Sequence, residues 1–269
     1  MILDPDREAL IERRLIGHFS RLAYPDVATA ARWSLSIAGA AGRFRPLRAL
    51  LEVARPATEA REGERPGPRG PRLLVSGMGS GSEMIAAREL GFGAIHGTEV
   101  DAFYVTLVAD RLAGHPGFFP LPIDGMRTPY ADGSFDFVIS GHIVEHTADP
   151  AAYVAEHLRV LKPGGFLLIE FPTRFHTREL HTGLPSLEWL PARLRTGILS
   201  SIGYSKGLGA LGFSDETRRL CRAITETGLK QVSLGRVRRW AGASGIRTTL
   251  VGKGRPGPGV VYGLFQRSR

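Results

Sequence analysis

The sequence contains a single cysteine, Cys221, so no disulfide can form within the chain and no cysteine-rich zinc cluster is possible. No apolar run approaches the roughly 20 residues that a membrane-spanning helix requires. The segment Asp4–Glu8 is acidic and polar, where a secretory signal would be basic and then apolar. Together these absences favour a cytoplasmic protein that folds around a conventional hydrophobic core.

Lysine is also scarce, since only four of the 35 basic residues are Lys and the remainder are Arg. The net charge of +9 is unevenly distributed along the 269 residues. Residues 172–269 carry 17 basic and 5 acidic residues, whereas residues 72–171 carry 6 and 12. A basic C-terminal third favours an anionic partner, whether small molecule, nucleic acid or lipid surface. We interpret its densest cluster, Arg236–Trp240, as a solvated strand edge.

The chain divides into two parts at a segment rich in Pro, Gly and charged residues, 55–71, which we interpret as a linker. Before it, apolar residues recur at helical spacing over 5–54, with Gly42 separating a second from a third helix. Residues 1–71 are therefore predicted to form a helical cap and linker. Residues 72–269 form the second part, with a lid-like insertion at about 172–213.

Beyond the linker, short apolar segments alternate with amphipathic ones, which is typical of a parallel sheet covered by helices on both faces. Strands are predicted at 72–76, 94–99, 118–123, 135–140 and 166–171, and helices at 82–90, 102–113 and 149–161. Two or three late strands are predicted near 229–236, 247–252 and 259–266.

The first predicted strand runs into Gly77-Met78-Gly79-Ser80-Gly81, a loop whose glycines allow close approach of a ligand to a helix N-terminus. Ser82 stands where a dinucleotide-binding loop needs its third glycine, which disfavours a dehydrogenase. Glu99 follows the loop by about 20 residues, where a carboxylate can bind two ribose hydroxyls. Asp124, after the third strand, can accept a hydrogen bond from an adenine amino group.

Four segments in this order resemble the class I S-adenosylmethionine-dependent methyltransferases of the broad small-molecule type. The resemblance covers about 100 residues, and its segments are PRLLVSGMGSG, GTEVD, IDGMRTPYADGSFDFVISGHIVEHTADP and HLRVLKPGGFLLIEFP. It implies an α/β, Rossmann-like fold with a seven-stranded, mostly parallel sheet of order 3-2-1-4-5-7-6. Helices would cover both faces, and the N-terminal helices would form a cap over the cofactor cleft.

The resemblance also assigns S-adenosylmethionine as cofactor and implies how it is bound. The glycine loop would hold its methionyl part, Glu99 its ribose, and Val100 with Met126 its adenine. The residues assigned to the cofactor in this way are Gly77, Met78, Gly79, Gly81, Glu99, Val100, Asp124, Gly125, Met126, Ser140 and Gly141. One position departs from the family pattern, because Val75 stands where an Asp or Glu usually precedes the first glycine by two residues.

Two histidines in the turn after the fourth strand are candidates for catalysis. His142 would lie beside the reactive methyl group as a general base, and His146 is the second candidate. The motif His142-Ile143-Val144-Glu145-His146 also matches an inverted zinc-peptidase pattern. A strand directly before the motif and Pro150 soon after it disfavour the helix that such a metal site requires, so no metal is predicted.

Past the fifth strand, a second group of residues is predicted to bind the acceptor, since ligands of parallel sheets bind at the carboxyl ends of the strands. This group comprises Arg174, His176, Arg178 and His181, of which the arginines can bind an anion.

These observations predict methyl transfer to an oxygen or nitrogen of a polar small molecule, such as a glycan, an aminosugar, a lipid precursor or a secondary metabolite. Two alternatives stay open, an RNA methyltransferase and a non-catalytic scaffold with a methyltransferase fold. The motifs of amino-methylating and C5-methylating DNA enzymes are absent from the sequence. The sequence indicates no oligomeric state.

Overall fold

The computed structural model describes residues 3–21, 26–48, 50–51, 70–172, 194, 232–255 and 260–269. Much of the predicted linker and of the predicted lid-like insertion lies outside these ranges. The division into a cap with linker and a core with lid therefore stays a prediction.

A seven-stranded sheet forms the centre of the molecule, with strand order β3-β2-β1-β4-β5-β7-β6. The first five strands run parallel, while β7 is antiparallel to both β5 and β6. This order and the single antiparallel strand confirm the predicted fold. The strands are β1 (Leu73–Ser76), β2 (Ile95–Glu99), β3 (Phe118–Pro122), β4 (Phe135–Gly141), β5 (Leu161–Pro172), β6 (Thr248–Gly254) and β7 (Val260–Arg267).

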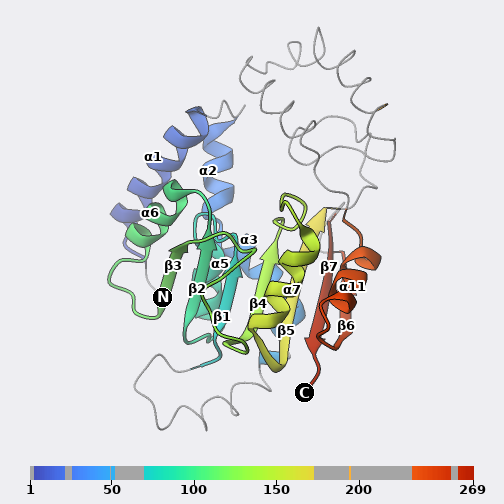
Figure 1. Ribbon diagram of the computed structural model, residues 1–269. Coiled ribbons are helices and arrows are strands. Elements are labelled where there is room, and N and C mark those ends of the chain that lie inside the picture. Colours follow the sequence, from blue (N-terminus) through green and yellow to red (C-terminus); the bar gives the residue numbers. More distant parts are fainter. Residues whose placement is uncertain are drawn as a thin grey trace.

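Helices cover both faces of the sheet (Figure 1). On one face pack α5 (Ser82–Glu89) and α6 (Ala102–Arg111), which supply Met84, Ile85 and Val108 to a buried cluster. On the other face pack α7 (Pro150–Val160) and α11 (Leu234–Ala243), whose apolar residues form a second buried cluster. The sheet is therefore the middle layer of three.

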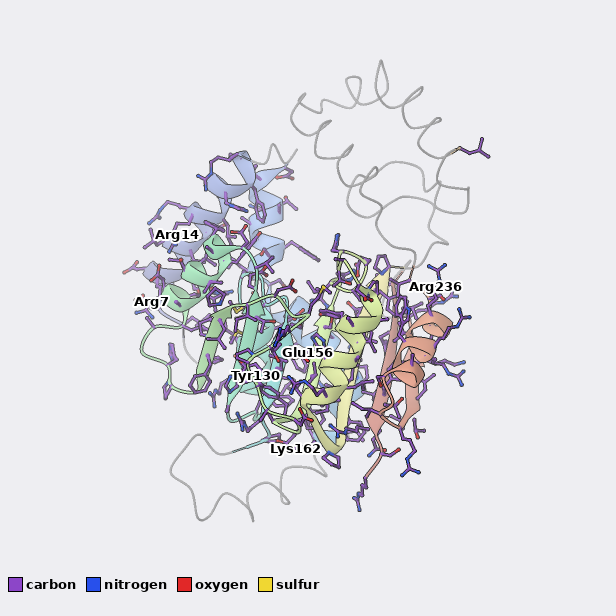
Figure 2. The ribbon with its side chains drawn as sticks, viewed as in Figure 1. Arg7, Arg14, Tyr130, Glu156, Lys162 and Arg236 are labelled. Carbon is purple, nitrogen blue, oxygen red and sulfur yellow. The ribbon has the colours of Figure 1, made fainter. Side chains whose placement is uncertain are left out.

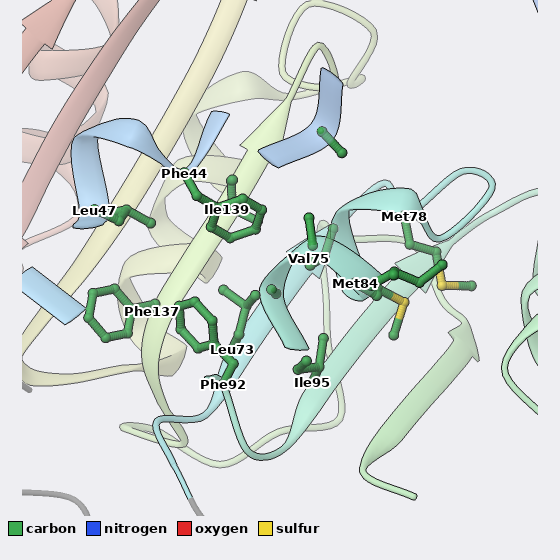
Figure 3. Close-up of a cluster of buried hydrophobic side chains, with 14 of the residues drawn as sticks. Phe44, Leu47, Leu73, Val75, Met78, Met84, Phe92, Ile95, Phe137 and Ile139 are labelled. Atoms are coloured by element: carbon green, nitrogen blue, oxygen red, sulfur yellow. The ribbon is translucent and has the colours of Figure 1, made fainter. Parts of the chain in front are cut away.

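The N-terminal segment contributes directly to the first of these clusters. Alternate residues of β1 and β4 point to this face, and they are joined there by Phe44 and Leu47 (Figure 3). Val75 is part of the same cluster and is fully buried. The position where the family usually has an acid is thus part of the apolar core in this chain.

The N-terminal helices are α1 (Pro5–Arg21), α2 (Val27–Leu35) and α3 (Ile37–Arg43), followed by a 3-10 turn, η1 (Arg45–Leu47). The predicted break at Gly42 lies one residue from the end of α3 at Arg43, but the predicted second helix is also divided at Ser36, which the sequence did not predict. The Ser36 backbone N–H closes α2 on Trp33, and its hydroxyl accepts a hydrogen bond from Gly39 N, which starts α3. A good N-cap residue therefore decided the boundary.

Helix α11 corrects a second expectation, the strand near 229–236 with its basic edge at Arg236–Trp240. Ser233 caps the helix by accepting a hydrogen bond from Arg236 N. Val237 and Ala241, four residues apart, are buried on one face of the helix. The arginines between them lie on the other face, so the cluster is the outer surface of a helix.

Candidate functional site

The carboxyl ends of β1, β2 and β4 lie in register at one edge of the sheet. Ser76 pairs with Thr98 on one side and with Ser140 on the other. The glycine loop after β1 also hydrogen-bonds to β2, since Gly77 N and Met78 N both donate to Thr98 O, at 2.9 and 3.0 Å. This arrangement brings the loop, Glu99 and Gly141 to one place, as the sequence predicts.

The glycine loop requires glycine for conformational and for steric reasons. Gly77, Gly79 and Gly81 all have positive φ, at +74°, +47° and +80°. A Cβ atom on Gly77 would also collide with the side chain of Ile143, in the turn after β4. The loop backbone therefore passes close to that turn, and it leads directly into the N-terminus of α5.

The Glu99 carboxylate connects the end of β2 to the glycine loop. Its Oε2 accepts a hydrogen bond from Gly79 N at 3.2 Å, and its Oε1 accepts from Val100 N at 2.9 Å. The next residue, Val100, has 72% of its surface exposed. A fixed acceptor thus lies beside an exposed apolar side chain, which suits a ribose next to an adenine.

Three further predicted cofactor residues follow β3. The exposed Asp124 accepts a hydrogen bond from Met126 N at 2.9 Å, which closes a tight turn. A Cβ atom on Gly125 would approach Ser76 Oγ to 2.7 Å, so a glycine allows this turn to approach β1. The structure brings Asp124, Gly125 and Met126 to the same sheet edge as Glu99, and their contacts with a cofactor stay a prediction.

A buried chain of hydroxyl groups ties β1, β4 and α7 together, and sequence reasoning missed it. Tyr153 donates to Ser76 Oγ at 2.8 Å, and its hydroxyl lies 2.8 Å from Ser140 Oγ. Burial raises the pKa of Tyr153, so the phenol stays neutral. Serines at the ends of two adjacent buried strands were the available signal.

His142 occupies an unusual conformation directly after β4. Its φ of +57° is the one positive value of a non-glycine residue among the described residues. Its Nε2 lies 3.2 Å from Glu170 Oε1, and its Nδ1 lies 3.6 Å from Glu145 Oε1. Burial alone would lower the pKa of His142, but the two carboxylates outweigh that effect and raise the pKa above its ordinary value of 6.5.

An arginine from the N-terminal helices reaches the same place. Arg43 Nε donates to Glu170 Oε1 at 2.8 Å, and Arg43 Nη1 forms an ion pair with Glu83 at the start of α5. Burial raises the pKa of Glu170, but His142 and Arg43 outweigh it and lower that pKa overall. We call Arg43, Glu83, His142, Glu145 and Glu170 the acidic cluster, because three carboxylates face one arginine and one histidine.

Glu145 is the least compensated member of this cluster. Its side chain is 1% exposed, and neither carboxylate oxygen has a hydrogen-bond partner within the part of the chain that the structure describes. Among the described residues, the one ion-pair partner of Glu145 is His142. His146, the second predicted catalytic residue, has an exposed side chain in the same turn, and its role stays a prediction.

The predicted acceptor-binding residues Arg174, His176, Arg178 and His181 lie outside the described residues, so their role also stays a prediction. Among the residues that the structure describes, no group of three or more His, Cys, Asp and Glu side chains could hold a metal ion. In the same ranges, no helix combines the length and apolarity that crossing a bilayer requires.

Comparison with known proteins points to one family. Residues 74–169 match the family model described as "Methyltransferase domain". A protein of Mycobacterium tuberculosis named as an uncharacterized methyltransferase is 36% identical over 104 residues, or 39% of this chain and 40% of that protein. The chain thus spans about two fifths of the length of the curated relatives it matches.

Solved structures share the fold at low sequence identity. An S-adenosylmethionine-dependent methyltransferase from Mesorhizobium loti is 16% identical, with a TM-score of 0.54, over 86% of this chain and 100% of that one. The trans-methyltransferase CalH, in complex with SAH, is 14% identical, with a TM-score of 0.57, over 91% of this chain and 60% of that one.

Proposed function

We propose that this chain, whose residues 74–169 belong to the class I S-adenosylmethionine-dependent methyltransferase family, transfers a methyl group to a polar small molecule. The acceptor atom would be an oxygen or a nitrogen. The observation that carries the proposal is the meeting of the glycine loop, Glu99 and the acidic cluster around His142 at one edge of the sheet.

The residues at this edge fit S-adenosylmethionine. Positive φ angles let the loop turn tightly, a Cβ atom at Gly79 would have no atom within 4 Å, and Glu99 supplies an acceptor for ribose hydroxyls. The negative charge of the acidic cluster suits a cationic cofactor. Because Val75 is buried in the core, the loop would bind the cofactor without the acid that the family usually has there.

The bound cofactor would supply a methyl group attached to a positively charged sulfur. The protein would place the acceptor heteroatom in line with that methyl group and exclude water. The bond from the heteroatom to the methyl carbon forms as the carbon–sulfur bond breaks, and S-adenosylhomocysteine leaves. His142 would take the acceptor's proton, and Glu145 and Glu170 would stabilise the resulting imidazolium.

RNA methylation is the second candidate, and the charge distribution favours it. After Glu226 the chain has nine basic residues and no acidic one. Arg238 and Arg239 of α11, Lys253 and Arg255 are among them, and all four side chains are exposed. A surface of this kind attracts polyanions.

A methyl-transfer assay separates these candidates. The purified protein is incubated with methyl-labelled S-adenosylmethionine and either a small-molecule extract or total RNA. We expect label in the small-molecule fraction and its loss in His142→Ala. Label in RNA instead would support the second candidate. No transfer to either pool, together with no binding of S-adenosylhomocysteine by a folded sample, would support a non-catalytic scaffold.

A further inference from the structure

Arg111, the last residue of α6, is fully buried, with a side-chain exposure of 0%. A buried arginine is costly to desolvate unless hydrogen bonds and an opposite charge compensate for the lost water. The residues that compensate for this desolvation therefore indicate the structural role of Arg111.

The charge of Arg111 is balanced by the first turn of the N-terminal helix α1. Glu8 accepts two hydrogen bonds in a fork, from Arg111 Nε at 2.8 Å and from Nη2 at 2.7 Å. These two residues are 103 positions apart in the sequence. The bidentate pair thus fixes α1 against the end of α6.

A third nitrogen of the guanidinium is hydrogen-bonded to the glycine loop and to the first residue of α5. Arg111 Nη1 donates to Ser80 O at 2.8 Å and to Ser82 Oγ at 2.9 Å. Ser80 stands between Gly79 and Gly81, two residues with positive φ. The same side chain that binds Glu8 therefore also holds the Ser80 carbonyl of this loop.

Helix α2 also contacts this region directly, near its C-terminal end. The hydroxyl groups of Ser80 and Ser82 both donate to Ser34 O, at 2.6 and 2.9 Å. Ser80 is thus held on both sides, by Ser34 through its hydroxyl and by Arg111 through its carbonyl.

A second ion pair between α1 and α6 lacks any such contact with the loop. Arg14 Nη1 lies 2.6 Å from Asp110 Oδ2, with side-chain exposures of 29% and 58%. Figure 2 shows Arg14 on α1, on the side of the molecule where α6 lies. It joins the same two helices at their surface, so it is a matched control for the Glu8–Arg111 pair.

We infer that Glu8 and Arg111 are positioning residues, which couple the docking of α1 to the conformation of the cofactor-binding loop at 77–81. The inference rests on the proposed function, because it assigns this loop to S-adenosylmethionine. Undocking α1 removes the counter-charge of Arg111, the side chain that holds the Ser80 carbonyl. By linkage, a cofactor that stabilises the loop also stabilises the docked α1.

The test is calorimetric binding of S-adenosylhomocysteine to the full chain and to two variants, Glu8→Gln and Arg14→Ala. We expect Glu8→Gln to bind at least tenfold more weakly, about 1.4 kcal/mol, and Arg14→Ala to bind as the wild type does. In turnover, Glu8→Gln should raise KM for the cofactor and leave kcat at saturating cofactor nearly unchanged. Glu8→Asp, which keeps the charge, should recover part of the affinity.

Hydrogen exchange of the wild-type chain provides a readout that needs no variant to fold. S-adenosylhomocysteine should slow exchange in α1 as well as in the glycine loop. Equal affinities of Glu8→Gln and Arg14→Ala, or unchanged exchange in α1 on binding, would overturn the coupling alone. A folded wild-type chain that does not bind S-adenosylhomocysteine would overturn the proposed function together with it.

Discussion

Two arginines connect the N-terminal segment to the same edge of the sheet, and their surroundings differ. Arg111 is fully buried, paired by a fork to Glu8 and hydrogen-bonded to the loop backbone. Arg43 is 23% exposed and lies among carboxylates that outnumber the cationic side chains. The buried, charge-balanced surroundings of Arg111 suit a structural role. The excess of carboxylates around Arg43, next to His142, suits proton transfer.

The largest expected effect on stability comes from replacing the buried Arg111. Arg111→Met leaves Glu8 without its partner and the Ser80 carbonyl without its donor, so the free energy of unfolding should fall by about 3–5 kcal/mol. Urea denaturation measures this change. Arg14→Ala, at the exposed pair, should cost at most about 1 kcal/mol. Similar losses in the two variants would contradict the distinction between the pairs.

Two glycines provide the next comparison, Gly77 in the glycine loop and Gly141 beside the acidic cluster. Gly77→Ala places a Cβ atom against Ile143 at a φ of +74°, where strain alone costs about 1–3 kcal/mol. Its affinity for S-adenosylhomocysteine should fall at least tenfold, about 1.4 kcal/mol. In Gly141→Ala the nearest approach of the Cβ atom is 3.2 Å, to the Arg43 guanidinium, and Gly141 has no positive φ, so its loss should be smaller. The reverse order would contradict this account of the loop.

The acidic cluster predicts a specific pH dependence. The pKa of His142 is raised, so its contribution to stability is fully present below pH 6.5 and is lost as pH rises through the folded-state value. A general base must be neutral, so kcat/KM should rise over that same range. Glu145→Gln removes one carboxylate that raises the pKa, so the rise should move to lower pH.

A suitable control is Glu156→Gln, because Glu156 lies in α7 and hydrogen-bonds to Thr128 and Arg159, not to His142. Its pH profile should keep the wild-type midpoint. An unmoved midpoint in Glu145→Gln, measured by kcat/KM and by NMR titration of His142, would remove Glu145 from the set of groups that control this histidine.

Short-range signals in the sequence predicted most of the fold. Strands β1 to β5 follow from apolar segments bounded by turns, and the glycine spacing at 77–81 located the loop. The basic cluster Arg236–Trp240 is predicted to be a strand edge, but Ser233 caps a helix there. Local capping therefore determines the type of this element.

The ion pairs that organise the site could not be predicted in the same way. Arg43 and Glu170 are 127 positions apart, and Arg111 and Glu8 are 103 positions apart. Periodicity in the sequence cannot pair residues that are so far apart along the chain. From the sequence alone, each of these side chains could equally be an ordinary surface charge on a helix or strand. Only the three-dimensional fold brings them together.

Glu99 is the residue on which the proposed cofactor site depends most directly. Calorimetry should compare S-adenosylhomocysteine binding by the wild type, Glu99→Ala and Asp101→Ala, since Asp101 is a neighbouring acid that caps α6. We predict binding by the wild type and by Asp101→Ala, and a loss of at least tenfold, about 1.4 kcal/mol, in Glu99→Ala. Equal binding by all three proteins, or none by a folded wild type, would contradict the proposed site.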